Sequence, residues 1–232
     1  MFPFQEINRD DLLRTADELE NVMLIRDALI QCGLSVSETK FEAISVAIQY
    51  LKTNKALTVG DKTFLDCLGC RGEGSMYAIA FGFGNLLSIE VTKKTLKQGQ
   101  RLVEIIAPQF GGKLDLSQIT FETGGFNQFD VAGFDCIFMD VTLFRSTLID
   151  ESTLITEFLE YCSTANVGSF FILVTTVPTI NLNDYCDYSG RFRLLLDASV
   201  GTKVTEEERQ GLGTVGIFEV VEDVRATEDN EL

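Results

Sequence analysis

Short apolar runs alternate along the chain with stretches in which apolar residues recur every three or four positions. The runs predict buried strands at residues 64–68, 85–91, 119–122, 136–140, 168–177, 191–197 and 214–221. The helical spacing predicts helices at residues 8–32, 39–55, 75–83, 92–107 and 152–165. Strands that alternate with helices favour a parallel sheet with helices on both faces. The last two strands lack a full helix between them, which predicts a reversed pair at one edge.

One stretch, residues 64–91, organises the rest of the chain. A short apolar run is followed at once by three glycines, Gly69, Gly72 and Gly74, then by an apolar helix and a strand that ends at Glu90. Glycines let the backbone approach a ligand closely, and a helix N-terminus presents free N–H groups. An acid at the tip of the second strand can accept hydrogen bonds from ribose hydroxyls. The order of these features predicts a nucleoside-binding βαβ unit.

The spacing of the loop narrows the choice of nucleoside. The loop has the pattern G-x-x-G-x-G and is preceded by Asp66, whereas a dinucleotide-binding loop has G-x-G-x-x-G. It is closer to the acid-x-G-x-G-x-G loop of class I S-adenosylmethionine-dependent methyltransferases, with one residue out of register. An ordinary strand-to-helix turn is the alternative, in which Asp66 caps the following helix and Glu90 is a solvated residue.

Several segments resemble this family in order along the chain. They are residues 64–74, 87–91 (LSIEV), 124–126, 134–144 and 168–177. Within the family, the chain is most similar to the non-SET histone lysine methyltransferases of the disruptor of telomeric silencing (DOT1-like) type. The resemblance implies an α/β fold, a seven-stranded Rossmann-like methyltransferase sheet with helices on both faces. The expected organisation is an N-terminal helical extension (1–57), the methyltransferase-like domain (58–225) and an acidic tail (226–232).

The resemblance also implies two sets of site residues and S-adenosyl-L-methionine as the cofactor. The cofactor-binding set is Asp66, Gly69, Gly72, Gly74, Glu90, Gly125 and Phe126. The set expected beside the transferable methyl group is Asp140, Val141, Thr142 and Phe144. Phe126 and Phe144 are also consistent with plain core aromatics. A glycine, Gly125, stands where that family has an acid, and Asp140 with Val141 replaces two asparagines.

Composition and charge bear on the partners. The 232 residues include 35 acidic and 19 basic side chains, for a formal net charge of −16. This balance favours a basic protein partner and disfavours direct nucleic-acid binding, which depends on lysine and arginine. No apolar run approaches the roughly 20 residues that span a membrane, and no signal peptide is evident, so an intracellular location in the nucleus or cytoplasm is expected. Cys67 and Cys70 form a C-x-x-C, but without histidine or a second such pair no metal site is expected.

The predicted function is methyl transfer from S-adenosylmethionine to a basic protein, with lysine as the candidate acceptor residue. Two alternatives stay open. One is a catalytically weak or dead methyltransferase-like module that serves as an acidic protein-interaction partner. The other is a class I methyltransferase that acts on a small molecule or on RNA.

Overall fold

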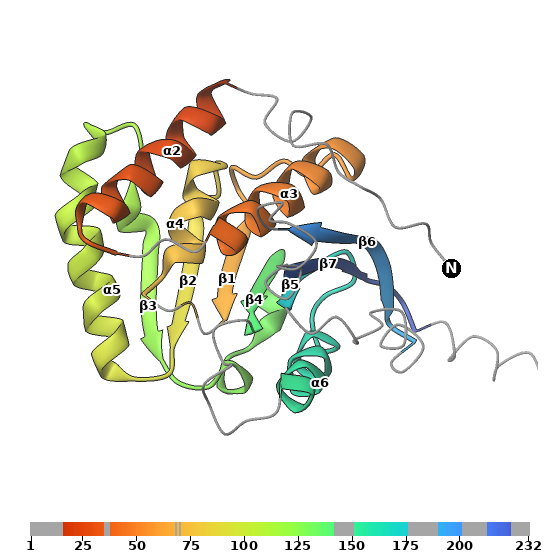
Figure 1. Cartoon of the computed structure of the whole chain (residues 1–232). Helices are drawn as coiled ribbons and strands as arrows, with labels where there is room; N and C mark the ends of the chain where they lie inside the picture. Colours follow the sequence, from red (N-terminus) through yellow and green to blue (C-terminus); the bar gives the residue numbers. More distant parts are fainter. Residues whose placement is uncertain are drawn as a thin grey trace, which may run out of the picture.

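The computed structural model describes residues 16–34, 38–67, 69, 71–141, 151–175, 190–200 and 213–223. Its helices are α2 (Ala16–Gln31), α3 (Glu38–Asn54), α4 (Glu73–Ala80), α5 (Lys93–Ile106) and α6 (Glu151–Cys162). Its strands are β1 (Thr63–Cys67), β2 (Asn85–Glu90), β3 (Ile119–Thr123), β4 (Cys136–Asp140), β5 (Phe170–Thr175), β6 (Phe192–Val200) and β7 (Gly213–Val220). Short 3₁₀ turns are η1 (Ala107–Phe110), η2 (Leu116–Gln118), η3 (Phe126–Gln128) and η4 (Val131–Gly133). Figure 1 shows the arrangement of the helices and strands.

The described strands form one seven-stranded sheet in the order β3-β2-β1-β4-β5-β7-β6. The strands β1 to β5 are parallel, and β1 lies at the centre between β2 and β4. The strand β7 is inserted antiparallel between β5 and β6. Both the central first strand and the reversed pair at one edge agree with the prediction. The order reverses between β1 and β4, which is where open α/β sheets bind ligands.

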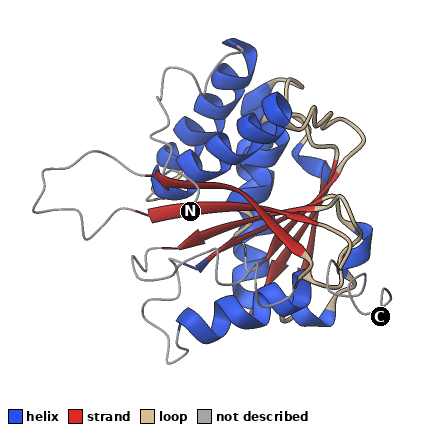
Figure 2. Ribbon diagram, turned by 90° about the vertical axis from the view of Figure 1, so that its right-hand side faces the viewer, coloured by secondary structure: helices blue, strands red, loops and turns tan. Residues whose placement is uncertain are grey.

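Helices cover both faces of the sheet, and Figure 2 shows them on the two sides of the strands. The alternation of side chains along each strand creates the two faces. Phe64 and Phe138 join a core with α2, α3, α4 and α5. Leu65 and Ile137, one position away, join a second core with the apolar face of α6. The central strands are therefore apolar on both sides, which explains their nearly continuous apolar runs.

The N-terminal helices α2 and α3 pack on the first of these faces. The helix α3 contacts α4, β5 and β7, and the Tyr50 hydroxyl donates to the Leu195 carbonyl at 2.9 Å. Lys55 forms an ion pair with Glu219 of β7 at 2.7 Å. These contacts hold the last turns of α3 on the sheet, while Lys40 in its first turn lies beside Gly69 and Asp140, at the carboxyl ends of β1 and β4. Residues 8–15 of the predicted helix at residues 8–32 lie outside the described residues.

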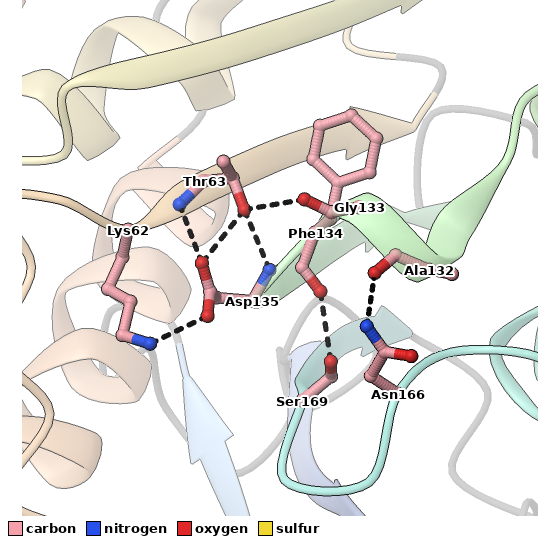
Figure 3. A network of polar contacts seen from close by, with 8 residues as sticks. All are labelled: Lys62, Thr63, Ala132, Gly133, Phe134, Asp135, Asn166 and Ser169. Atoms are coloured by element: carbon pink, nitrogen blue, oxygen red, sulfur yellow. Dashed lines mark hydrogen bonds and ion pairs between the residues drawn. The ribbon is translucent and has the colours of Figure 1, made fainter.

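A polar clasp, made of Lys62, Thr63 and Asp135, joins the amino ends of β1 and β4 (Figure 3). The Asp135 carboxylate accepts from the Thr63 backbone N–H at 3.0 Å and from the Lys62 ammonium at 2.7 Å. The Thr63 hydroxyl lies 2.9 Å from the same carboxylate and accepts from the Asp135 N–H. The clasp fixes the register of the two central strands at the edge away from the glycine loop.

None of the described helices combines the length and the apolar character needed to cross a membrane.

Candidate functional site

Four polar side chains gather at the carboxyl ends of the central strands. Asp66 of β1, Ser88 and Glu90 of β2, and Asp140 of β4 are all at most 2% exposed. They share one face because residues two apart on a strand point the same way, and the register pairs Asp66 with Ser88. The sequence placed Asp66, Glu90 and Asp140 near the strand ends, and the structure brings the three together there, on one face of the sheet. Ser88 was not predicted.

The glycine loop closes tightly around Asp66. A Cβ atom on Gly69 or Gly74 would lie 2.5 or 2.7 Å from the Asp66 Oδ2 atom, so neither position accommodates a side chain. The Ser75 backbone N–H, in the first turn of α4, donates to the same oxygen at 2.9 Å. Asp66 therefore does cap the helix, as the alternative interpretation had it. Its other oxygen, Oδ1, is buried and has no hydrogen-bond partner among the described residues, and the same holds for the Ser88 hydroxyl.

The middle of the loop turns through a left-handed conformation. Arg71 has φ 80° and Gly72 has φ 75°. A residue with a Cβ is strained there, and such strain often collects at functional sites. Glu90 supports the turn, because its carboxylate accepts from the Arg71 backbone N–H at 2.7 Å. The tip of β2 and the glycine loop are thus directly joined.

A lysine that the sequence analysis missed, Lys40 of α3, reaches into this cluster. Its side chain is 1% exposed, and its ammonium lies 3.9 Å from Asp140 and 3.5 Å from the Gly69 carbonyl. The signal was present, since Lys40 continues the buried stripe of Ile44, Ile48 and Leu51 at helical spacing. A lysine on an apolar stripe indicates a buried charge that needs partners.

Burial dominates the electrostatics of the cluster. Desolvation raises the pKa of Asp66 and of the buried Glu73, while the Lys40 charge opposes both shifts. Burial and the neighbouring Asp66 charge raise the pKa of Glu90 to about 7, against the effect of the Arg71 N–H. The loop residue Glu73 was also missed by the sequence analysis. Acids with raised pKa values in a crevice are typical of ligand-binding and catalytic sites.

The remaining predicted residues lie elsewhere. Gly125 begins the turn η3 after β3, and the Phe126 ring is buried against Phe158 and Tyr161 of α6, with centroids 6.0 and 5.3 Å away. Val141 is fully buried in the same core. The rings and methyl groups of Phe126 and Val141 therefore serve packing, which is the plain core role left open for Phe126. Thr142 and Phe144 lie outside the described residues. So does Cys70 of the C-x-x-C pair, and its contact with Cys67 is therefore not described.

Solved structures with the same architecture include methyltransferases and proteins provisionally assigned as methyltransferases. The tRNA methyltransferase TrmK of Bacillus subtilis, which forms M1A22, matches with a TM-score of 0.57 and 14% identity over 84% of this chain and 70% of its own. PH1948 of Pyrococcus horikoshii, provisionally assigned as an RNA methyltransferase, matches with a TM-score of 0.54 and 14% identity. The match covers 89% of this chain and 100% of PH1948. HI0767 of Haemophilus influenzae, provisionally assigned as a methylase, matches with a TM-score of 0.51 and 13% identity. The match covers 77% of this chain and 88% of HI0767.

This chain has the class I methyltransferase fold. The predicted seven-stranded sheet is therefore confirmed, and so is the general resemblance to S-adenosylmethionine-dependent methyltransferases. No protein-family model and no curated protein sequence matches the chain. The similar structures give no support to the finer resemblance, the DOT1-like histone lysine type. They are also at odds with the expectation that no nucleic acid is bound, since a tRNA methyltransferase is among them.

Proposed function

We propose that this chain is an S-adenosylmethionine-dependent methyltransferase that acts on RNA. The observation that carries the proposal is the buried acid Glu90 at the tip of β2, bonded to a strained glycine loop next to the point where the strand order reverses. That combination, on a class I methyltransferase fold, is what a ribose-binding edge requires.

The residues at this edge fit the charge of the cofactor. Asp66, Glu73, Glu90 and Asp140 provide four carboxyl groups, and Lys40 is the one lysine among them in the described chain. S-adenosylmethionine carries a sulfonium, an ammonium and one carboxylate, so it is a net cation. The Asp66 Oδ1 atom and the Ser88 hydroxyl are buried acceptors that no described residue satisfies, and they gain from a donor in the site.

Each side chain has a distinct role in the proposal. Glu90 accepts from the ribose hydroxyls, while Gly69 and Gly72 bring backbone close to the ligand. Lys40 holds the carboxyl groups of Asp66 and Asp140 in place by its charge. The bound cofactor would supply a methyl carbon that the acceptor atom attacks in line, with neutral S-adenosylhomocysteine as the leaving group. Where the acceptor atom carries a proton, Asp140 at the end of β4 would be the carboxylate that takes it up.

The acceptor class rests on separate support. Two of the solved structures that share this fold are the tRNA methyltransferase TrmK and PH1948, which is provisionally assigned as an RNA methyltransferase. This favours the RNA alternative over the histone-type reading. Phe126 adds nothing to the choice of acceptor, because its ring packs against Phe158 and Tyr161 of α6.

Calorimetry of the purified chain with S-adenosylmethionine tests the first half of the proposal. We expect saturable binding by the wild type and a ten- to hundredfold loss in Glu90→Gln. A tritium-transfer assay with bulk RNA, histones and a second basic protein tests the acceptor. Transfer to RNA that is lost in Asp140→Asn supports the proposal, whereas cofactor binding with transfer only to protein would overturn the acceptor class.

A basic protein acceptor is the second candidate, because a net charge of −16 attracts lysine- and arginine-rich chains. Lysine is the residue that such an acceptor would present. Transfer to histones but not to RNA would favour it. Cofactor binding with transfer to neither would favour the non-catalytic docking module.

A further inference from the structure

The helix α5 carries an unusual concentration of unneutralised positive charge. Among the eight lysines that the structure describes, five lie within 4.0 Å of a carboxylate, and they are Lys40, Lys52, Lys55, Lys62 and Lys113. The other three, Lys93, Lys94 and Lys97, form no ion pair with a described residue, and all three are exposed. Residues 91–103 contain no acid, in a chain with 35 of them. The described lysines without an ion-pair partner among the described residues therefore all lie on one helix.

The three lysines and Arg101 form one surface, which we call the basic face of α5. At 3.6 residues per turn they fall within an arc of about 100° that lies opposite Gly99, Leu102 and Ile106. Those three residues are buried. The basic face thus points to solvent along about 12 Å of helix. Glu104, on the last turns of the helix, pairs with Arg101 at 3.0 Å.

The buried side of α5 lies directly against the candidate cofactor site. A Cβ on Gly99 would lie 2.9 Å from the Arg71 carbonyl of the glycine loop and 2.7 Å from the Phe121 ring. The helix also begins three residues after Glu90. A ligand on the basic face is consequently one helix diameter, roughly 10 Å, from the loop.

Helix stability does not explain the position of these lysines. Lys93 and Lys94 occupy the first turn, where the helix dipole favours acids and disfavours cations, and that turn contains no acid. Thr92 caps the helix by accepting from the Thr95 N–H at 3.1 Å. The first turn therefore combines free N–H groups with two lysines, and the dipole and the lysines attract the same kind of ligand, an anion.

We propose that the basic face of α5 is the docking surface for the phosphate backbone of the RNA acceptor. This inference rests on the proposed function and names how its substrate is held. Lysines spaced along a helix suit a linear polyanion. The arc from Lys93 to Arg101 carries no large apolar side chain, so it lacks the apolar wedge of a membrane-binding helix. The acidic remainder of the chain repels phosphate and steers RNA toward this one face.

The test compares two triple variants with the same change in charge. The first is Lys93→Gln, Lys94→Gln, Lys97→Gln, and the control is Lys52→Gln, Lys55→Gln, Lys113→Gln, whose lysines are paired with acids. Fluorescence anisotropy measures binding to bulk tRNA between about 50 and 200 mM salt. We expect the first variant to bind at least about tenfold more weakly at low salt, with a salt slope smaller by about 2 to 3. The control should retain affinity and slope to within about twofold.

Three results of the tRNA titrations would overturn the docking surface. They are an absence of RNA binding by the wild type, equal losses in both triple variants, and an unchanged slope in the α5 variant. Preferential binding to vesicles with anionic lipid over tRNA, lost in the same variant, would assign the face to membranes and also overturn it. Calorimetry with S-adenosylmethionine separates this inference from the proposed function. Loss of RNA binding in an α5 variant that is folded supports the surface even where the wild type fails to bind cofactor.

Discussion

The acids at the two ends of the central strands lie in opposite environments. At the amino ends, Asp135 accepts from Lys62 and from the Thr63 backbone, and these bonds lower its pKa although partial burial opposes the shift (Figure 3). At the carboxyl ends, burial raises the pKa of Asp66 and Glu90, and no described residue donates to one oxygen of Asp66. One edge of the sheet therefore carries an acid whose hydrogen bonds stabilise the fold. The other carries buried acids with raised pKa values.

The difference indicates what each edge is for. A fully bonded carboxylate such as Asp135 gains nothing from a ligand, because its acceptors are already used. A buried acceptor without a donor costs free energy until a ligand supplies one. The arrangement at Asp66, Ser88 and Glu90 is consequently more consistent with a binding site than with a structural network. The predictions below test that contrast, beginning with the largest expected effect.

Replacing Lys40 with methionine should give the largest loss of stability. It removes the cation that opposes the raised pKa values of Asp66, Glu73 and Glu90. Breaking a buried ion pair costs roughly 3 kcal/mol or more. The folded state then binds more protons than the unfolded state, so stability falls as pH rises. We expect chemical denaturation to show a greater loss at pH 8 than at pH 6.

Lys55→Met is the matched control for this prediction. Lys55 pairs with Glu219, but both side chains keep contact with solvent, so the expected loss is below about 1 kcal/mol. If the two variants lose the same stability, or if the loss in Lys40→Met does not depend on pH, the buried cluster is not held by Lys40.

Replacing Glu90 with glutamine should separate binding from stability. We expect the affinity for S-adenosylmethionine to fall ten- to hundredfold, since one charge-assisted bond is worth about 1.5–3 kcal/mol. The pKa of Glu90 is about 7 in the fold, above its ordinary value of 4.5, so its ionised form is disfavoured there. The variant should therefore be more stable than the wild type at pH 8, and the gain should shrink at lower pH.

The exposed acid Glu122, on β3 beside β2, provides the control. Glu122→Gln removes the same charge from the surface and should leave the affinity within about twofold. Unchanged affinity in a folded Glu90→Gln variant would remove Glu90 from the ribose site. A lower stability of that variant at pH 8 would show that the acid serves the fold.

Most of the fold could be predicted from the sequence because its signals are local. Burial fixes the spacing of apolar residues on a strand or a helix. The apolar runs at β1, β4 and β5 and the apolar stripe on α5 can therefore be recognised from the sequence. The carboxyl-edge acids Asp66, Glu90 and Asp140 followed from strand ends, since parallel strands bring their tips together.

The rest of the site depends on contacts between distant segments. Lys40 and Asp140 are separated by 100 positions in the chain, and only the packing of α3 on the sheet brings them together. Phe126 was assigned to the cofactor by resemblance, but packing against α6 decides where its ring goes. The net charge of −16 did not indicate the basic face of α5, because a net charge does not show where in the chain the basic residues lie.

Replacing Asp135 with asparagine should have a smaller effect on stability and none at the site. The change removes the charge that Lys62 and Thr63 satisfy, and the group keeps about a third of its exposure, so we expect a loss of about 1–2 kcal/mol. The pKa of Asp135 is lowered in the fold, so the loss should be present at neutral pH and fade as pH falls below the ordinary value of 3.8. Cofactor affinity should stay within about twofold, and a larger change would mean that the two edges are coupled.

The smallest expected effect is the pH dependence of cofactor binding. With a pKa of about 7, Glu90 is about one-tenth ionised at pH 6 and about nine-tenths ionised at pH 8. Only the ionised carboxylate accepts well from both ribose hydroxyls, so the affinity for S-adenosylmethionine should rise up to about tenfold over this interval. Protein stability should fall over the same interval, because ionisation of Glu90 is disfavoured in the fold. Calorimetry and thermal unfolding in the same buffers measure the two trends. In Glu90→Gln the affinity should be nearly flat with pH, and an equal rise there would assign the dependence to other groups or to the cofactor itself.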